Sequence, residues 1–396
     1  MKKMHKTLWL VTMLVVGMAV FSAFYVSNAF GFAAAGDDFD HTATTVARHT
    51  VAAGISHSMA ITSDGTLWTW GSNYFGQLGD GTTEDRLSPV PIMEDVFAVS
   101  AGRYHSVAIK NDGTLWVWGG NMQGQLGNGY ATGWDDMTAH PTPIKLLDDI
   151  IAVSAGYAYT LAIKADGSLW GWGTGFAGQL ASGRGVDVGS PVPIHIMDDV
   201  VHVTAARFHA LAIRTDGSLW AWGRTFGHPT TTQWSHLLTP TWIMDNVIDA
   251  SAGFAFTTAI TADGTLWTWG DNVSGQLGHG NHRNQLRPRR VRDFGDAVAL
   301  SAGHNHTLAI RADGSLWGWG STVAGGLGES LLSTPLRPAH IMDDVVGVFA
   351  GEGNTLIIKA DGSLWGLGGN WAGQLGDGTT QTHRTPIHIL DDILIP

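Results

Sequence analysis

Short apolar runs alternate with turns rich in glycine, aspartate and proline along most of the chain. Within a run such as Leu115-Trp116-Val117-Trp118, successive side chains would point to opposite faces, and this period of two is typical of β-strands. The dipeptide Asp112-Gly113 precedes this run, and Asp-Gly favours a tight hairpin turn because glycine tolerates positive φ. The pattern therefore predicts consecutive antiparallel hairpins.

Four such runs form a unit that repeats. In one unit they are Val99–Gly102, His105–Ile109, Leu115–Trp118 and the Pro-x-x-Ile segment Pro141–Ile144. The Asp-Gly turn recurs seven times at intervals of 47 to 54 residues, and a period in this range indicates a solenoid or a propeller. Seven units of four strands predict an all-β, seven-bladed β-propeller with four-stranded blades over residues 50–396.

Large and small side chains are sorted along the third run. Trp170 and Trp172 share one face and are separated by Gly171, so a large face of one blade can fill a small face of the next. We therefore expect the paired tryptophans to be core residues, with a sugar-stacking ladder as the alternative. Residues Ile393–Pro396 align with Ile150–Val153, the start of a unit. We expect them to pair with the strands of the first unit and close the ring.

The N-terminus has the pattern of an export signal. Lys2, Lys3 and Lys6 precede an uncharged, mostly apolar run at residues 8–26, and small residues near 27–35 fit a cleavage site. We expect residues 1–35 to be a signal peptide, with a membrane anchor as the alternative because the run approaches spanning length. Residues 36–49 would be a linker, and the protein would be secreted or exposed at the cell surface.

Composition narrows the function classes. Charged residues make up 14% of the chain, and there are 53 glycines, 18 tryptophans and no cysteine. The absence of cysteine excludes disulfides, thiolate metal sites and a cysteine nucleophile. The formal net charge is −12, so a phosphate backbone would be repelled and nucleic-acid binding is disfavoured.

Three patterns could carry chemistry, and each has a simpler explanation in the repeat. Four units place histidine at one position (His57 and its equivalents), but another unit has Phe256 there, so we expect a histidine that caps its turn and no metal site. The GxGxxG match at 173–178 lacks a following helix, so no dinucleotide cofactor is expected. Paired aspartates such as Asp148-Asp149 are expected to be solvated turn residues. The sequence thus contains no catalytic constellation, and we predict a protein that is not an enzyme.

The repeats resemble those of the regulator of chromosome condensation family. The resemblance rests on Ala101–Ser106, Asp112–Gly119 and Asn121–Gly127, and it extends over about residues 50–396. It implies a seven-bladed propeller, here an exported bacterial member. The founding member of the family is a nucleotide exchange factor that binds chromatin, but no residue here is assigned to exchange. A secreted bacterial propeller that inhibits β-lactamase is similar in architecture, and it implies protein binding through a loop face.

Loops of variable sequence are expected on the face opposite the Asp-Gly turns, and binding residues are usually found in such loops. We predict an exported interaction module that binds a protein partner there. The alternatives are a propeller that binds cell-wall glycan and a regulator resembling an exchange factor. Aromatic and arginine side chains are enriched at interface hot spots. The candidate binding residues are Arg103, Tyr104, Trp134, Tyr157, Arg207, Phe208, Trp234, Phe254 and His304.

Overall fold

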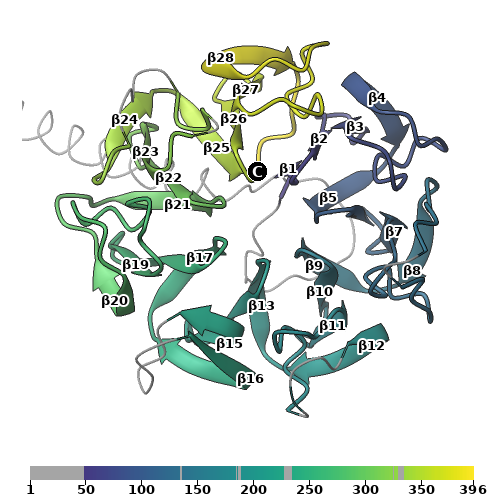
Figure 1. Ribbon diagram of the computed structural model, residues 1–396, viewed down its shortest axis with the longest axis horizontal. Helices are drawn as coiled ribbons and strands as arrows, with labels where there is room; N and C mark the ends of the chain where they lie inside the picture. The colour runs from purple at the N-terminus through teal and green to yellow at the C-terminus, as the bar shows by residue number, and fades with distance from the viewer. Residues whose placement is uncertain are drawn as a thin grey trace, which may run out of the picture.

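The computed structural model describes residues 49–133, 136–183, 185, 189–226, 234–323, 325–328 and 334–396. The predicted export segment 1–35 and the linker up to residue 48 lie outside this part of the chain. Twenty-eight strands form seven four-stranded antiparallel sheets, and the sheets surround a central channel like blades (Figure 1). The predicted seven-bladed propeller is confirmed. No helix in the described ranges combines the length and hydrophobicity needed to cross a membrane.

Each blade takes four strands in chain order. Blades one to three contain β1 (Val51–Ala53), β2 (His57–Ile61), β3 (Leu67–Gly71), β4 (Arg86–Met93), β5 (Val96–Ala101), β6 (His105–Lys110), β7 (Leu115–Gly119), β8 (Ile144–Leu147), β9 (Ile150–Ala155), β10 (Tyr159–Lys164), β11 (Leu169–Gly173) and β12 (Ser190–Met197). Blades four and five contain β13 (Val200–Ala205), β14 (His209–Arg214), β15 (Leu219–Phe226), β16 (Trp234–Met244), β17 (Val247–Ala252), β18 (Phe256–Thr261), β19 (Leu266–Gly270) and β20 (Gln285–Arg290). Blades six and seven contain β21 (Ala297–Ala302), β22 (His306–Arg311), β23 (Leu316–Gly320), β24 (Ala339–Met342), β25 (Val345–Ala350), β26 (Asn354–Lys359), β27 (Leu364–Gly368) and β28 (His383–Leu390).

The Asp-Gly turn joins the two middle strands of every blade, as expected. In blade two Gly113 has φ 77°, and the backbone N–H of Thr114 donates to Oδ1 of Asp112 at 3.0 Å. The outermost strand is less regular than its Pro-x-x-Ile pattern suggests. Leu115 of β7 pairs with Leu147, so β8 covers Ile144–Leu147 and lies C-terminal to the predicted segment Pro141–Ile144.

Only one tryptophan of each pair reaches the core between blades. Trp172 is fully buried against Val107, Val117 and Leu126 of the preceding blade, and its indole N–H donates to the carbonyl of Gln125 at 2.9 Å. Trp170 remains half-buried. The prediction that both tryptophans are core residues is therefore correct for the second and wrong for the first, which lies nearer the Asp-Gly turn at the edge of the blade interface.

The repeated histidine connects neighbouring blades. Nε2 of His105 lies 3.0 Å from Oγ1 of Thr160 in the next blade, and that hydroxyl donates to the carbonyl of Gln125 at 3.0 Å. Because the threonine proton is already used, Nε2 must donate. The prediction that this histidine caps its own turn is therefore wrong, because its hydrogen-bond partner belongs to the next blade. Burial, together with a smaller effect of nearby His57, lowers the pKa of His105 to about 3, so the ring is neutral.

Both chain ends complete the first blade. The backbone N–H of Ile61 in β2 donates to the carbonyl of Thr50 at 2.8 Å, while its carbonyl accepts from the N–H of Leu394 at 2.9 Å. Ile393 also bridges to Thr62, so the C-terminal residues occupy the first part of the innermost strand and β1 occupies the rest. The predicted ring closure is confirmed, and the C-terminus lies on the inner side of the ring between the last and first blades (Figure 1).

His49, the residue before Thr50, points into the central channel. The carbonyl of His49 accepts from Val99 in blade two, and its ring meets Phe349 of blade seven at 6.4 Å. The pKa of His49 is lowered to about 4, mainly by burial and further by His202, whereas Asp249 raises it. Since His202 and Asp249 belong to the inner strands of blades four and five, the His49 side chain projects across the channel.

Candidate functional site

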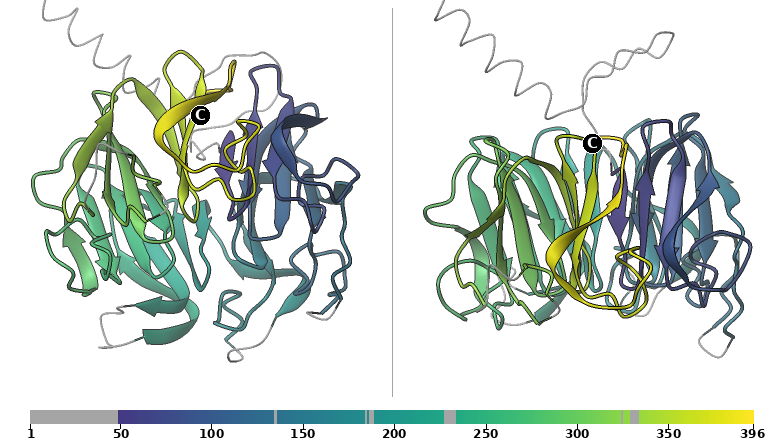
Figure 2. Two further views of the ribbon diagram at one scale, coloured as in Figure 1. Left: turned by 45° about the horizontal axis from the view of Figure 1, so that its top comes forward. Right: turned by 90° about the horizontal axis from the view of Figure 1, so that it is seen from above.

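Two sets of turns define the two ends of the ring, and Figure 2 shows them at opposite edges in the side view. The Asp-Gly turns adjoin the paired-aspartate turns, since the N–H of Ile150 donates to the carbonyl of Gly113 at 2.9 Å. At the other end the Ala-Gly-x-x-His turn adjoins the long glycine-rich loop, with the N–H of Gly120 donating to the carbonyl of Tyr104 at 2.7 Å. We call this second end the loop face.

The Ala-Gly-x-x-His turn projects two side chains outward. In blade two the N–H of Gly102 donates to the carbonyl of His105 at 2.9 Å and closes the turn. A Cβ atom on Gly102 would lie 2.3 Å from Cε1 of His105, so the histidine ring packs directly on the glycine backbone, whereas blade four accommodates Ala206 at the equivalent position. Arg103 and Tyr104, which lie between them, are held out over the mouth of the central channel.

The first turn residues of successive blades form a continuous stack around this mouth. The guanidinium of Arg103 lies 4.4 Å from the centroid of the Tyr157 ring, and the guanidinium of Arg207 lies 4.4 Å from the centroid of the same ring. Arg207 also lies 5.1 Å from Phe254, which stacks on His304 at 4.1 Å and 27°. Such cation–π contacts stabilise the arginines without using up their N–H donors.

Charge at the mouth is mostly positive although the chain as a whole is acidic. Arg103, Arg207 and one carboxylate, Glu352, line the cavity at the mouth, and the nearest Glu352 oxygen is 3.9 Å from Nε2 of His304. The pKa of His304 is lowered, first by burial and also by Arg207, while Glu352 raises it. Among the described contacts, the Nε atom of Arg207 is buried and has no hydrogen-bond partner.

The aromatic surface continues outward from the mouth along the loops. Tyr104 contacts Phe75 at 4.6 Å, and Phe75 contacts Tyr74, whose side chain is 59% exposed. On the other side Phe208 contacts Phe176 at 5.9 Å and lies 5.2 Å from Phe254. The mouth and these two extensions form one face with exposed rings at its edge.

The loops that carry these rings are fixed by internal hydrogen bonds. Oδ1 of Asn73 accepts from the N–H of Leu78 at 2.9 Å, and its Nδ2 reaches Asp80 at 3.0 Å. The carbonyl of Gln77 in the same loop accepts from the Trp118 indole of the next blade at 2.9 Å. Rigid support reduces the entropy lost on binding.

The channel mouth holds a small cavity. Its volume is 140 Å³, and it is lined by the Ala-Gly-x residues of six blades and by Ala205, Ala206 and Arg207 of blade four. A cavity of this size accommodates one side chain and is smaller than ordinary ligand pockets. No group of three or more histidine, aspartate or glutamate side chains in the part of the chain described here could hold a metal ion.

Seven of the nine predicted site residues come together at this face. They are Arg103, Tyr104, Tyr157, Arg207, Phe208, Phe254 and His304, and all seven are half-buried. Trp134 lies outside the described residues. Trp234 begins β16, where its backbone pairs with Phe226, and its side chain is outside the description.

Sequence reasoning missed three contributors to this face. Phe75 and Phe176 lie in the glycine-rich loops, and Arg224, which is 5.6 Å from the Phe208 ring, lies in β15, the third strand of blade four. The irregular loop of that unit was visible in the sequence, but the direction of the arginine was not.

Comparison with known proteins gives a consistent result. A family model described as "Regulator of chromosome condensation (RCC1) repeat" matches residues 64–109, 112–163, 166–213 and 263–310. A second model with the same description matches residues 49–77, 98–125, 150–179, 247–276 and 297–325.

Curated relatives match over part of their length. The Arabidopsis thaliana "Ultraviolet-B receptor UVR8" is 32% identical over 149 residues, which cover 35% of this chain and 32% of that protein. The mouse "E3 ubiquitin-protein ligase HERC2" is 26% identical over 137 residues, covering 34% of this chain and 3% of that protein. The matched segments therefore span a third or less of these relatives.

Solved structures agree in fold. Yeast RCC1 (Prp20), in its structure bound to Kap60, has a TM-score of 0.73 at 17% identity and covers 91% of both chains. Human WBSCR16 has a TM-score of 0.67 at 21% identity, covering 76% of this chain and 83% of that one. At these identities the likeness concerns the fold alone.

Proposed function

The chain belongs to the regulator of chromosome condensation (RCC1) repeat family, and from this premise we propose that it is an interaction propeller that binds a partner protein at the channel mouth. The observation that carries the proposal is the stack of Arg103, Tyr157, Arg207 and Phe254, in which the Nε atom of Arg207 lacks a partner. Half-exposed aromatic rings with arginines between them match the composition of interface hot spots.

The partner would present a carboxylate side chain to the mouth. Arginine binds carboxylate through paired N–H donors, and the cavity volume of 140 Å³ suits one such side chain. Apolar residues around that carboxylate would pack on Tyr104 and Phe208 and exclude water. A structure of yeast Prp20p reports binding to Gsp1p and histones, which are protein partners of that molecule. For this chain, nucleotide exchange remains a prediction without an assigned residue.

The test compares three versions of the protein in quantitative capture from an extract of the source cells. The first is the native protein, and the second carries Tyr104→Ala, Phe208→Ala and Phe254→Ala together. The third is a control in which Tyr130, 47% exposed, and Trp242, 48% exposed, are replaced by alanine. Proteins retained by the native form and the control but lost from the triple variant would support the mouth as the site.

Thermal melting distinguishes a binding role from a structural one. If the triple variant still captures the same proteins but melts well below the native form, these aromatic side chains only stabilise the propeller, and the assignment is wrong. Arg207→Lys then tests whether the partner presents a carboxylate side chain to the mouth. Lysine keeps the charge but loses the fork of donors, so the affinity of the captured partner should fall by about tenfold.

We also propose that the protein acts outside the cytoplasm. The support is the sequence of residues 1–35, with three lysines before an apolar run. Cell fractionation with N-terminal sequencing of the product tests this. Full-length protein in the cytoplasmic fraction would contradict it.

A further inference from the structure

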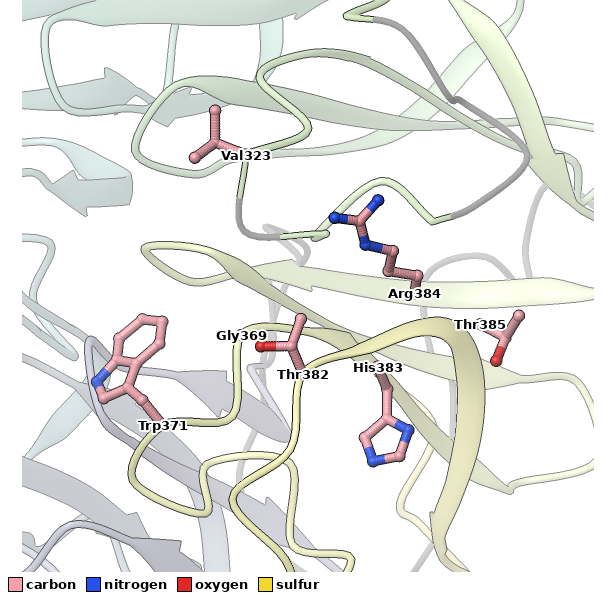
Figure 3. A pocket seen from close by; sticks show the side chains of 7 residues that line it. All are labelled: Val323, Gly369, Trp371, Thr382, His383, Arg384 and Thr385. Atoms are coloured by element: carbon pink, nitrogen blue, oxygen red, sulfur yellow. The ribbon is translucent and has the colours of Figure 1, made fainter.

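We propose that a second site, in the cleft between blades six and seven, binds an acidic oligosaccharide. The cleft lies away from the channel mouth, on the outer part of the loop face. Its volume is 560 Å³, within the usual range for small-ligand sites, and it is lined by Val323, Gly369, Trp371, Thr382, His383, Arg384 and Thr385 (Figure 3). This proposal does not depend on the protein partner proposed above.

Trp371 supplies a flat apolar plate. Its side chain is 53% exposed, whereas blades five and six place Val273 and Val323 at the same repeat position. A Cβ atom on Gly369 would lie 2.4 Å from Cζ3 of Trp371, so the indole is packed directly on this glycine backbone. The ring is therefore positioned before any ligand arrives, and its free face can take the apolar C–H face of a pyranose ring.

Arg384 supplies an uncompensated positive charge. In blade one, Arg86 at the start of β4 pairs with Asp80 at 2.8 Å. In blade seven the equivalent aspartate, Asp377, is already paired with His383 at 2.7 Å, and Arg384 is the next residue along the strand. Arg384 is exposed and forms no hydrogen bond or ion pair with the residues that the structure describes.

The stem of Arg384 is anchored although its head is free. At the junction of blades seven and one, Leu87 packs within 2.5 Å of the position that a Cβ atom on Gly373 would take. At the junction of blades six and seven, Cγ of Arg384 lies 3.5 Å from the corresponding position on Gly325. An arginine thus occupies a place where a leucine would complete the contact, and its guanidinium remains available for a carboxylate.

The remaining lining groups favour a sugar over a peptide. Figure 3 shows Trp371 on one side of the cleft and Arg384 with Thr385 on the other, with Thr382 between them. The two threonine hydroxyls can donate and accept hydrogen bonds, as sugar hydroxyls require. The apolar lining consists of Trp371 and Val323, both exposed, so the cleft lacks an enclosed apolar hole that would anchor a peptide side chain.

The experiment is calorimetric titration of the intact protein with three probes. These are trigalacturonate, the neutral sugar maltotriose and the peptide Glu-Glu-Glu. We expect saturable binding of trigalacturonate, weaker binding of maltotriose and no binding of the peptide. Stronger binding of the peptide, equal binding of both sugars, or no saturable binding up to the solubility of the probes would each overturn the proposal.

Variants place the ligand in the cleft. Trp371→Ala and Arg384→Gln should each weaken trigalacturonate binding by about tenfold or more, because each removes a principal contact. Only Trp371→Ala should also abolish the residual binding of maltotriose. The matched controls are Tyr74→Ala, an exposed ring at the same repeat position in blade one, and Arg290→Gln on the outermost strand of blade five. If the controls weaken binding equally, or the cleft variants leave it unchanged, the site is wrong.

Discussion

The closure of the ring makes a sharp prediction about two isoleucines at the C-terminus. Ile393 is 3% exposed and packs with Val51, Trp70 and Leu356 at the junction of the last and first blades, whereas Ile395 is 44% exposed. Replacing a buried isoleucine by alanine costs about 2–5 kcal/mol, and we expect the lower half of this range because a terminal segment can shift. An exposed isoleucine costs less than about 0.5 kcal/mol.

These energies convert to measurable melting temperatures. With an unfolding entropy of about 2.1 cal/mol/K per residue over the whole propeller, Ile393→Ala should lower the Tm by about 3–5 °C and Ile395→Ala by less than about 1 °C. Differential scanning calorimetry of the two variants beside the native protein provides the comparison. Equal melting temperatures for both variants would show that Ile393 does not hold the ring closed.

Truncation after Asp392 extends the test. It removes Ile393 together with the bonds from the N–H of Ile393 to Gly362 and from the N–H of Leu394 to Ile61, each worth about 1 kcal/mol. The truncated blade also exposes part of a strand edge, so we expect a larger fall in Tm and concentration-dependent association in light scattering. A longer deletion from residue 386 would remove most of β28 as well and would mix two effects.

Three further outcomes are expected. Stability should be constant above about pH 7 and fall as the pH drops below 6.5, because His105 takes up a proton in the unfolded chain before it does in the folded protein, where burial depresses its pKa to about 3. His105→Asn introduces the residue type found at Asn354 and should reduce this pH dependence, as measured by thermal melting at a series of pH values. Trp172→Phe should cost about 1–3 kcal/mol in denaturant unfolding, because it removes buried ring atoms and the indole hydrogen bond to the Gln125 carbonyl, which then keeps only the bond from Thr160; the exposed Trp242→Phe should be near neutral. Gly167→Ala should destabilise by about 1 kcal/mol or more, since its φ is 81°, and an unchanged midpoint would contradict the hairpin geometry.

The repeat made the fold predictable. The Asp-Gly spacing fixed the number of hairpins, and the alternation in segments such as Leu169–Gly173 fixed which strands have two buried faces. Boundaries were less predictable where an insertion intervenes, as before β8, because the pairing of Leu115 with Leu147 depends on the length of the loop and not on the proline.

The sequence allowed us to predict which residues lie at the site, but not how their side chains are arranged. Repeat position alone placed Arg103, Tyr157 and Arg207 at the same level of neighbouring blades. Their stacking depends on side-chain directions that a repeat pattern does not contain. For the same reason the sequence suggested that His105 caps its turn, because the partner Thr160 lies 55 positions away and becomes a neighbour only when blades pack. The repeat pattern likewise did not show that Arg384, which stands at the position of Leu87, would have no ion-pair partner among the described residues, because His383 pairs with Asp377 as Arg86 does with Asp80.

The way the chain enters the ring bears on how the protein can be attached to a surface. From His49 the chain runs through β1 toward the mouth, so a tether joined directly to residue 49 would start on the Asp-Gly side, opposite the candidate partner site. A sensor chip or bead coupled there would leave the loop face open to solution. A fusion placed after Pro396 would instead begin inside the ring, close to Gly347, and would compete for the space that closes the first blade.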